Sequence, residues 1–428
     1  MKRIYSMYQM ALRTFTPAGT LRAAAEQLPR LAQLGFDFLY LCPVFVADDD
    51  PDPVTWSERQ RRSGTYNPKN PYKMKDYFHV DSEYGTDDDL RDFVTAAHAL
   101  GLRVMLDLVY LHCGKNAVFA AEHPEYLVCG ADGRPIVGDR WPFARLNYEC
   151  AGAREYLLEN MMHYVTAYGI DGYRCDVGDC VPLDFWREGV RRITAVRPDF
   201  VMLNEGWEDE SVRGVFDLYY AGYPADIGKD TYVTDVKAFA ATVHERGVEH
   251  HLTNKIENHD IASDSGLLRY ERRNGHDMTD CALFMMYMES GVPFVWNGNE
   301  FGDTAENNMF SNRFHGRRSA MDYSCAFTAY GRRRMELLTA LNRLRRTESA
   351  LLTGDTEIMD TPEKTLLLLR RGDRETLIAV LCTEPGGATV KLPAFAEDAV
   401  PLLARNASAE GNTACFAGAG FLLLKHTV

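Results

Sequence analysis

Residues 169–179 read GIDGYRCDVGD, an apolar segment that ends in charged side chains. The run from Ile170 to Tyr173 predicts a buried strand, and Arg174 and Asp176 come at its end. Because side chains two residues apart on a strand point to the same face, these two side chains should project together. A structural ion pair would also explain this pattern, so its meaning depends on the rest of the chain.

Short apolar runs like this one alternate with helical patterns along most of the chain. The expected strands cover residues 3–10, 36–42, 102–109, 170–177, 200–206, 214–220, 252–258 and 292–298. Amphipathic helices are expected at 20–35, 86–101, 151–168, 183–196, 232–246, 276–290 and 329–348. Eight strands that alternate with helices predict an α/β fold, the (β/α)8 TIM barrel.

Two insertions and a C-terminal change of pattern interrupt the alternation. A long polar loop at 46–77 follows the second expected strand, and residues 110–148 form an insertion after the third. From about residue 350, alternating strands separated by turns replace the helices. We therefore expect a barrel domain at 1–349, with the insertion 110–148, and a small antiparallel, β-sandwich-like domain at 350–428.

The composition limits the partners of the chain. Its 428 residues carry a formal net charge of −14, which disfavours nucleic acid and anionic membrane surfaces as partners. No stretch approaches the roughly 18 apolar residues of a membrane span. The ten cysteines show no zinc-binding spacing, and the start of the chain lacks the pattern of a signal peptide. We therefore expect reduced thiols and a cytoplasmic protein.

Polar residues gather at the C-terminal ends of four expected strands, the ends that form the mouth of a TIM barrel. These residues are Asp107, His112, Arg174, Asp176, Asn204, Glu205, Trp207, Asn258, His259 and Asp260. A helix cap or a surface charge would explain any one of them, but their common position predicts a functional site. There we expect Arg174 to orient Asp176 and to keep it ionised, because a nearby cation lowers the pKa of a carboxyl.

Four of these stretches resemble the signature regions of the α-amylase family, glycoside hydrolase family 13. In chain order they read DLVYLH (107–112), GYRCDV (172–177), LNEGW (203–207) and ENHD (257–260). The resemblance covers nearly all of the first 348 residues. It implies a retaining α-glycoside hydrolase that acts on α-glucans or maltooligosaccharides through a covalent glycosyl-aspartate intermediate.

The resemblance also implies a role for individual residues. Asp176 matches the nucleophile, Glu205 the general acid/base and Asp260 the carboxylate that stabilises the transition state. The residues implied to surround the sugar are Tyr72, His112, Arg174 and His259. Asp107 is implied to support the site through hydrogen bonds, and Trp207 is a candidate for stacking on the sugar.

Two features depart from the family pattern, and a third bears on metal binding. Leu111 stands where the family commonly has a calcium-ligating asparagine, so we expect no metal and no other cofactor. The acidic run 48–53 lacks the spacing of an EF-hand, and a solvated loop is the simpler interpretation. Asp179 and Cys180 replace a Lys-His pair on the leaving-group side, which puts a preference for long starch chains in doubt.

Three functions are compatible with the sequence. The first is an α-glucan hydrolase, whose substrate is an α-linked glucose oligo- or polysaccharide. The second is a transglycosylase or α-glucosidase with the same residues. The third is a non-catalytic carbohydrate-binding homologue, which loss of any of the three carboxylates would favour, and all three are present. The linkage, the chain length, endo or exo action and the oligomeric state remain open.

Overall fold

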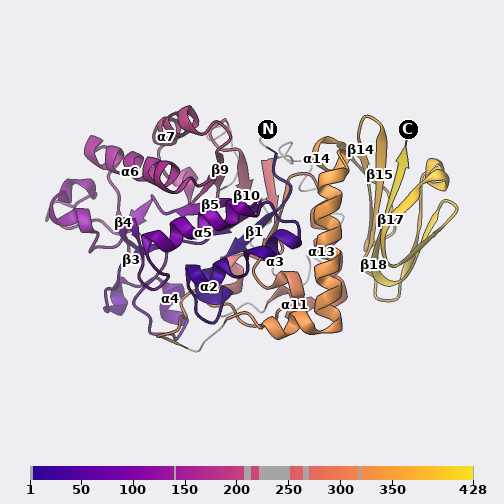
Figure 1. Cartoon of the computed structure of the whole chain (residues 1–428), viewed down its shortest axis with the longest axis horizontal. Coiled ribbons are helices and arrows are strands. Elements are labelled where there is room, and N and C mark those ends of the chain that lie inside the picture. The colour runs from indigo at the N-terminus through magenta and orange to yellow at the C-terminus, as the bar shows by residue number, and fades with distance from the viewer. Residues whose placement is uncertain are drawn as a thin grey trace.

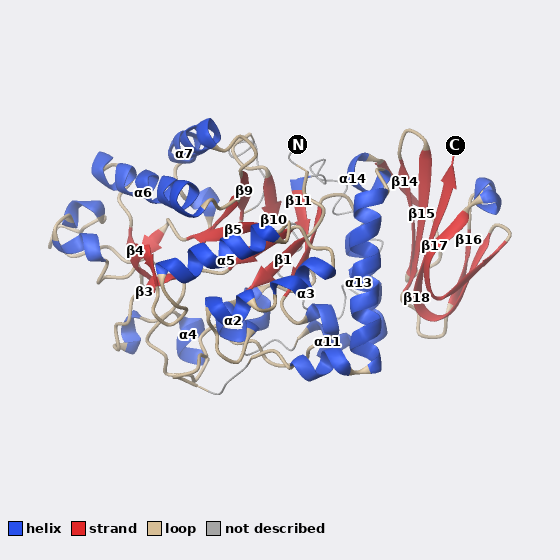
Figure 2. Ribbon diagram, viewed as in Figure 1, coloured by secondary structure: helices blue, strands red, loops and turns tan. Residues whose placement is uncertain are grey.

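A computed structural model describes residues 3–138, 141–206, 214–220, 251–263, 269–316 and 320–427 of the chain. Figure 1 shows a barrel surrounded by helices, with the long helix α13 (Ala329–Thr347) between it and a layer of C-terminal strands. The same division is clear when the elements are coloured by type (Figure 2). No helix among the described residues is long and apolar enough to cross a membrane.

Eight parallel strands form a closed barrel. They are β1 (Met7–Met10), β2 (Phe38–Leu41), β5 (Arg103–Leu108), β8 (Gly172–Cys175), β9 (Val201–Asn204), β10 (Leu218–Tyr220), β11 (Leu252–Asn254) and β12 (Val292–Trp296). β1 pairs with both β2 and β12, and this closes the ring. Each of these strands lies within an expected segment, so the predicted barrel is confirmed.

The helices outside the barrel follow their predicted positions with one clear exception. The longer ones are α5 (Asp87–Ala99), α6 (Ala151–His163), α7 (Leu183–Val196), α12 (His276–Met288) and α13. The helix expected at 20–35 is instead two helices, α2 (Leu21–Ala25) and α3 (Leu28–Gln33). Pro29 causes the break, because it has no backbone N–H for the preceding turn. The helix expected at 232–246 lies outside the described residues.

Short elements fill the loops around the mouth of the barrel. They are the helices α1 (Leu12–Phe15), α4 (Glu58–Arg62), α10 (His259–Ser263) and α11 (Tyr270–Asn274), and the strand pairs β3 (Phe45–Ala47) with β4 (Met74–Val80) and β6 (His112–Cys113) with β7 (Ala144–Arg145). A further short helix, α14 (Ala350–Thr353), follows α13 and leads to the C-terminal sheet. The first pair and α4 belong to the loop after β2, and the second pair belongs to the insertion after β5. Both loops therefore carry ordered structure at the end of the barrel where the polar residues were expected.

The C-terminal strands are antiparallel, as expected, and they form one sheet, while the sandwich-like arrangement stays a prediction. They are β13 (Asp355–Met359), β14 (Thr365–Arg371), β15 (Glu375–Cys382), β16 (Ala388–Lys391), β17 (Val400–Glu410) and β18 (Thr413–Thr427). The second half of β18 pairs with β15 and its first half pairs with β16. The sheet has a hydrophobic cluster of its own, which includes Leu367, Ile378, Val390 and Leu422. The domain boundary between residues 349 and 350 stays a prediction.

A buried arginine of the C-terminal sheet binds the barrel, and a second buried arginine binds the segment that leads to the sheet. Arg370 of β14 donates to the hydroxyl of Ser290, at 2.7 Å, and to the backbone carbonyl of Met288, at 3.3 Å. Arg345 of α13 donates to the carbonyl of Leu351 at 2.6 Å and also to that of Gly291. Burial and the neighbouring Arg370 lower the pKa of Arg345 to about 9. The two parts are thus held together by hydrogen bonds that water does not reach.

Candidate active site

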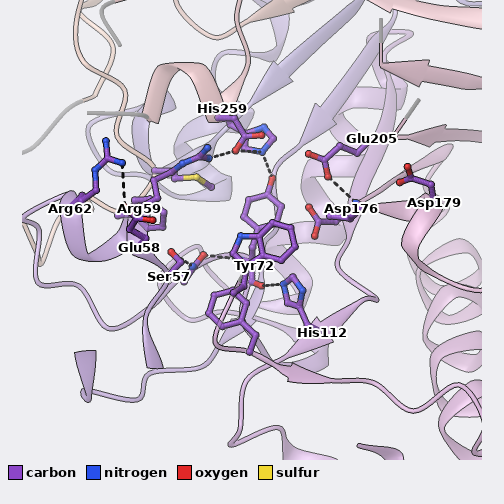
Figure 3. A pocket seen from close by; sticks show the side chains of 18 residues that line it. Ser57, Glu58, Arg59, Arg62, Tyr72, His112, Asp176, Asp179, Glu205 and His259 are labelled. Atoms are coloured by element: carbon purple, nitrogen blue, oxygen red, sulfur yellow. Dashed lines mark hydrogen bonds and ion pairs between the residues drawn. The ribbon is translucent and has the colours of Figure 1, made fainter. Parts of the chain in front are cut away.

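A pocket of about 440 Å³ lies at the C-terminal ends of the barrel strands (Figure 3). The predicted site residues that line it are Tyr72, His112, Asp176, Glu205, His259 and Asp260. Arg174 and Asp107 are not in its lining and have completely buried side chains. Trp207 lies outside the described residues. The structure therefore brings together every predicted site residue that it describes.

Arg174 contacts three carboxylates at the base of the site. Its Nη1 donates to Asp107 Oδ1 at 2.7 Å and to Asp176 Oδ1 at 2.9 Å. Its Nη2 lies 2.8 Å from Glu205 Oε2. Parallel pairing of β5 with β8 puts Asp107 directly beside Arg174, and pairing of β8 with β9 brings the end of the next strand close. Arg174 and Asp176 do project together, and the arginine also binds the strands on either side.

Arg174 lowers the pKa of Asp176, as expected, but the expectation that it keeps Asp176 ionised is wrong, because the net shift is upward. Burial, and then the negative charge of Glu205, raise the pKa of Asp176 well above its ordinary value, and Arg174 offsets this only in part. The arginine cannot compensate fully because its single charge serves three carboxylates. The charge of Glu205 thus makes it harder for Asp176 to lose its proton.

Asp107 fixes three side chains around the pocket. Its Oδ2 accepts hydrogen bonds from the hydroxyls of Tyr40, at 2.6 Å, and Tyr72, at 2.8 Å. Its Oδ1 accepts from Arg174. A carboxylate with three donors and no exposed surface keeps the floor of the site rigid.

His259 stacks on Tyr72 and is held by a residue of the first barrel strand. The two rings lie 5.2 Å apart between centroids, with an interplanar angle of 13°. Gln9 Nε2 donates to His259 Nδ1 at 2.7 Å, which assigns the ring hydrogen to Nε2, 2.8 Å from the Tyr72 hydroxyl. Burial lowers the pKa of His259, so the ring is neutral. Sequence analysis did not single out Gln9, although a polar glutamine within an apolar strand indicates a side chain with a specific partner.

His112 positions the backbone of Tyr72. Its Nε2 donates to the Tyr72 carbonyl oxygen at 3.0 Å, and its ring lies 4.9 Å from that of Phe143. Burial lowers the pKa of His112 to about 4, so this ring is also neutral near pH 7. His112 and Asp107 thus hold Tyr72 from both its backbone and its hydroxyl.

The turn after Asp176 has an unusual backbone that serves Glu205. Val177 adopts a φ of 45°, a left-handed conformation that β-branched residues rarely accept. Its backbone N–H donates to Glu205 Oε2 at 2.8 Å. Next to Glu205, Gly206 lies so close to the Asp179 carboxylate that a side chain at 206 would have to displace it. The left-handed backbone at Val177 therefore accompanies a hydrogen bond that holds Glu205.

Arg59, which sequence analysis did not single out, forms an ion pair with Asp260. It belongs to α4, within the long loop after β2. Burial would raise the pKa of Asp260, but the guanidinium groups of Arg59 and Arg174 help to hold it below its ordinary value. No local pattern could have revealed this pair, because its partners lie 201 residues apart in the chain.

The acidic run 48–53 is only in part the solvated loop that we expected, because Asp48 and Asp50 are buried while the other four residues are exposed. The Nζ of Lys73 lies 3.9 Å from Asp48 Oδ1, and both side chains are almost completely buried. Lys115 binds Asp50 at 2.7 Å. The expectation overlooked that lysines from other segments could supply the counter-charges, which no spacing within the run reveals.

The residues do not fit the calcium site that the family pattern implies. Leu111, a buried leucine, has no side-chain oxygen for a cation. The ammonium group of Lys73 beside Asp48 would repel a cation there. Within the described ranges, no group of three or more histidine, cysteine, aspartate or glutamate side chains could hold a metal ion.

Lys73→Met is expected to lower the free energy of unfolding by about 3–5 kcal/mol, because it leaves Asp48 buried without its counter-charge. Denaturant-induced unfolding of the variant measures the loss. Lys75→Met is the matched control, since Lys75 pairs with Asp49 at 2.8 Å but both side chains are at least one-third exposed. It should cost less than about 1 kcal/mol. Equal losses, or a wild-type Tm that falls on addition of EDTA, would contradict this account.

Part of the chain matches a known family model, and most of its length is similar in sequence to known proteins. The family model for the α-amylase catalytic domain matches residues 8–126. A cyclomaltodextrinase from a Bacillus species is 26% identical over 407 residues, which are 87% of this chain and 67% of the relative. An intracellular maltogenic amylase from Bacillus subtilis is 24% identical over 78% of this chain and 56% of the relative. The chain thus spans between about half and two thirds of these relatives' lengths.

Solved structures show the same fold over nearly the whole chain. The α-amylase from Lactobacillus plantarum superposes with a TM-score of 0.80 at 24% identity and covers 98% of both chains. A cyclic α-maltosyl-(1→6)-maltose hydrolase from Arthrobacter globiformis gives a TM-score of 0.77 at 19% identity, over 99% of this chain and 98% of the other. The barrel with its C-terminal sheet is therefore an architecture that these proteins share.

Proposed function

Because the chain belongs to the α-amylase family, we propose that it is a retaining α-glycoside hydrolase acting on α-linked glucose oligo- or polysaccharides. One observation supports this most strongly. Arg174 binds one oxygen of Asp176 and lies against one oxygen of Glu205, which brings two carboxyls from adjacent strands to one side of a pocket. Retaining glycosidases need two carboxyls about 5–5.5 Å apart, one to attack and one to protonate.

In the first step Asp176 attacks the anomeric carbon of the bound glucose unit, while Glu205 donates its proton to the departing glycosidic oxygen. The bond between that carbon and oxygen breaks, and a glycosyl ester forms on Asp176. In the second step Glu205 removes a proton from water, the water attacks the anomeric carbon, and Asp176 leaves as a carboxylate. Two inversions at one carbon retain the α configuration.

The raised pKa of Asp176 limits this reaction at low pH. The reactive form has Asp176 ionised and Glu205 protonated. Burial and the charge of Glu205 raise the pKa of Asp176, so the nucleophile is lost by protonation as the pH falls. We therefore expect kcat/KM to decline on the acidic side at a pH above the ordinary range of an aspartate.

The remaining side chains bind the sugar on which the carboxyls act. We assign Tyr72 and the neutral His112 and His259 to the reacting glucose unit, since all three line the pocket and are held by hydrogen bonds. Asp260 stays ionised, and it would bind hydroxyls of that unit more strongly as positive charge develops on the ring. Binding that strengthens in the transition state raises kcat.

A panel of maltooligosaccharides, isomaltose, sucrose and trehalose tests this function, with products followed by NMR and chromatography. We expect hydrolysis of at least one α-glucoside, with the α-anomer as the first product. Products longer than the substrate would support the transglycosylase alternative instead. No turnover of any α-glucoside, or a β-anomer as first product, would refute the proposal.

We place the protein in the cytoplasm. All ten cysteines are free, as is usual for proteins of a reducing compartment. A relative that matches 78% of the chain is named as an intracellular enzyme.

A further inference from the structure

The pocket has two ends, and the second is formed by a helix that the mechanism does not use. Figure 3 shows Glu205, Asp176 and Asp179 at one side of the pocket, and Ser57, Glu58, Arg59 and Arg62 at the other. Tyr72 and His259 lie between the two groups. Because Glu205 protonates the leaving sugar, its side is the leaving-group side. The α4 side therefore faces the part of the substrate that stays on the enzyme, the glycone.

Buried hydrogen bonds hold α4 in place. Ser57 caps the helix, with its hydroxyl accepting from the backbone N–H of Gln60 at 3.1 Å. The side chain of Gln60 is buried and donates to the carbonyls of Asn67, at 2.9 Å, and Pro68, at 3.1 Å. The helix is thus bound to the segment that follows it.

The same wall includes a second loop, which carries Met309 and Phe310 into the pocket lining. Asn67 Nδ2 donates to the Phe310 carbonyl at 3.0 Å. The buried Arg13 donates from one nitrogen to the carbonyls of Met309, at 2.8 Å, and Lys69, at 3.1 Å. Three chain segments are therefore joined behind the pocket, and the wall is a fixed part of the fold.

Arg59 connects this wall to the part of the pocket that is assigned to the reacting glucose unit. Its guanidinium pairs with Asp260, the carboxylate that we assign to hydroxyls of that sugar. A second glucose unit on the glycone side would have to pass where the guanidinium lies. The pocket volume of about 440 Å³ is also near the lower end of the range for ligand sites.

We propose that α4, through Arg59, limits the glycone to a single glucose unit, so that the enzyme removes terminal glucose from the non-reducing ends of α-glucans. This inference rests on the proposed function and narrows it to exo action. Arg59 then has two roles. It orients Asp260, and it offers N–H donors to the hydroxyls that a terminal glucose has and an internal one lacks.

Two substrates that differ at one end test the inference. One is p-nitrophenyl α-maltoheptaoside, and the other is the same compound with its non-reducing end blocked by a 4,6-O-ethylidene group. We expect glucose as the first product from the free compound and cleavage of the blocked one at least about 100-fold more slowly, a difference of about 2.7 kcal/mol. Comparable rates, or maltose or a longer sugar as the first glycone product, would overturn the inference. Failure to cleave any α-glucoside would refute the proposed function instead.

Arg59→Ala tests the role given to the arginine. Any effect on Asp260 slows both substrates, so the measured quantity is the ratio of kcat/KM for the blocked compound to that for the free one. We expect this ratio to rise at least about tenfold. The matched control is Arg61→Ala on the same helix, since Arg61 is not in the pocket lining and donates to the carbonyls of Trp56 and Pro53. A ratio unchanged in Arg59→Ala, or raised equally in Arg61→Ala, would remove Arg59 from this role.

Discussion

Replacing Asp176 by asparagine is expected to lower kcat on α-glucosides by about 10⁴-fold or more, the scale of loss when a nucleophile is removed. The amide keeps the shape of the side chain but cannot form the glycosyl ester. Steady-state kinetics on the best substrate of the panel measure the loss, and circular dichroism checks the fold. A variant that keeps more than a few per cent of wild-type activity would show that Asp176 is not the nucleophile.

The same variant should be more stable than the wild-type protein at neutral pH. In the unfolded chain Asp176 ionises near the ordinary value of 3.8, whereas burial and Glu205 raise its pKa in the folded protein. Below the unfolded value both states are protonated, so the substitution has no electrostatic effect. As the pH rises from there, the unfolded chain releases its proton first, and the native state loses stability relative to it. Asparagine removes this cost.

Thermal unfolding of both proteins across this pH range measures the effect. The gain should be roughly 0.5–2 kcal/mol at pH 7, typical of a stabilising substitution, and should shrink towards zero near pH 3. A Tm below that of the wild type at pH 7 would mean that the ion pair of Asp176 with Arg174 outweighs the cost of burying it.

Glu205→Gln is expected to lower kcat on a natural α-glucoside by at least about 10²–10⁴-fold, because the leaving sugar oxygen departs poorly without a proton. α-Glucosyl fluoride has a leaving group that needs little protonation, so formation of the glycosyl ester on Asp176 should be much less impaired. Comparing the two donors, with pre-steady-state detection of the ester, separates loss of acid catalysis from loss of binding.

Azide then tests the second step in the same variant. Hydrolysis of the ester lacks its base when Glu205 is absent, and azide attacks without one. Azide should therefore restore turnover of the fluoride and give an α-glucosyl azide. Equal losses on both donors without rescue would show that Glu205 is not the acid/base. A β-configured azide would indicate direct displacement, and the covalent role of Asp176 would be wrong.

The barrel could be predicted because its strands are short apolar runs whose polar residues come at one end. That pattern depends on neighbours in the sequence, as in the run from Ile170 to Arg174, and all eight strands were found. The prediction of a single helix at 20–35 was wrong because it overlooked Pro29. A proline inside a helical pattern interrupts the helix. The helix expected at 86–101 was found as α5, and Thr86 and Asp89, which are close in the sequence, cap its start through reciprocal hydrogen bonds.

The parts of the site that sequence analysis missed depend on partners that are distant in the chain. Arg59 reaches Asp260, and Gln9 reaches His259, across more than 200 residues in each case. The prediction that Arg174 keeps Asp176 ionised failed for a related reason. The expectation considered one neighbouring cation, whereas the fold adds burial and a second carboxyl, and these outweigh it. The ionisation of a buried side chain depends on all the charges around it, and in this site those charges come from several strands.

The hydrogen bonds of Arg370 have a consequence for the way the chain loses its structure. Separating the C-terminal sheet from the barrel would leave Nη1 of Arg370, the carbonyl of Met288 and the hydroxyl of Ser290 without these partners, and each buried group left unpaired costs about 1–3 kcal/mol. Neither part can melt ahead of the other without that penalty. We therefore expect the C-terminal sheet and the barrel to unfold together.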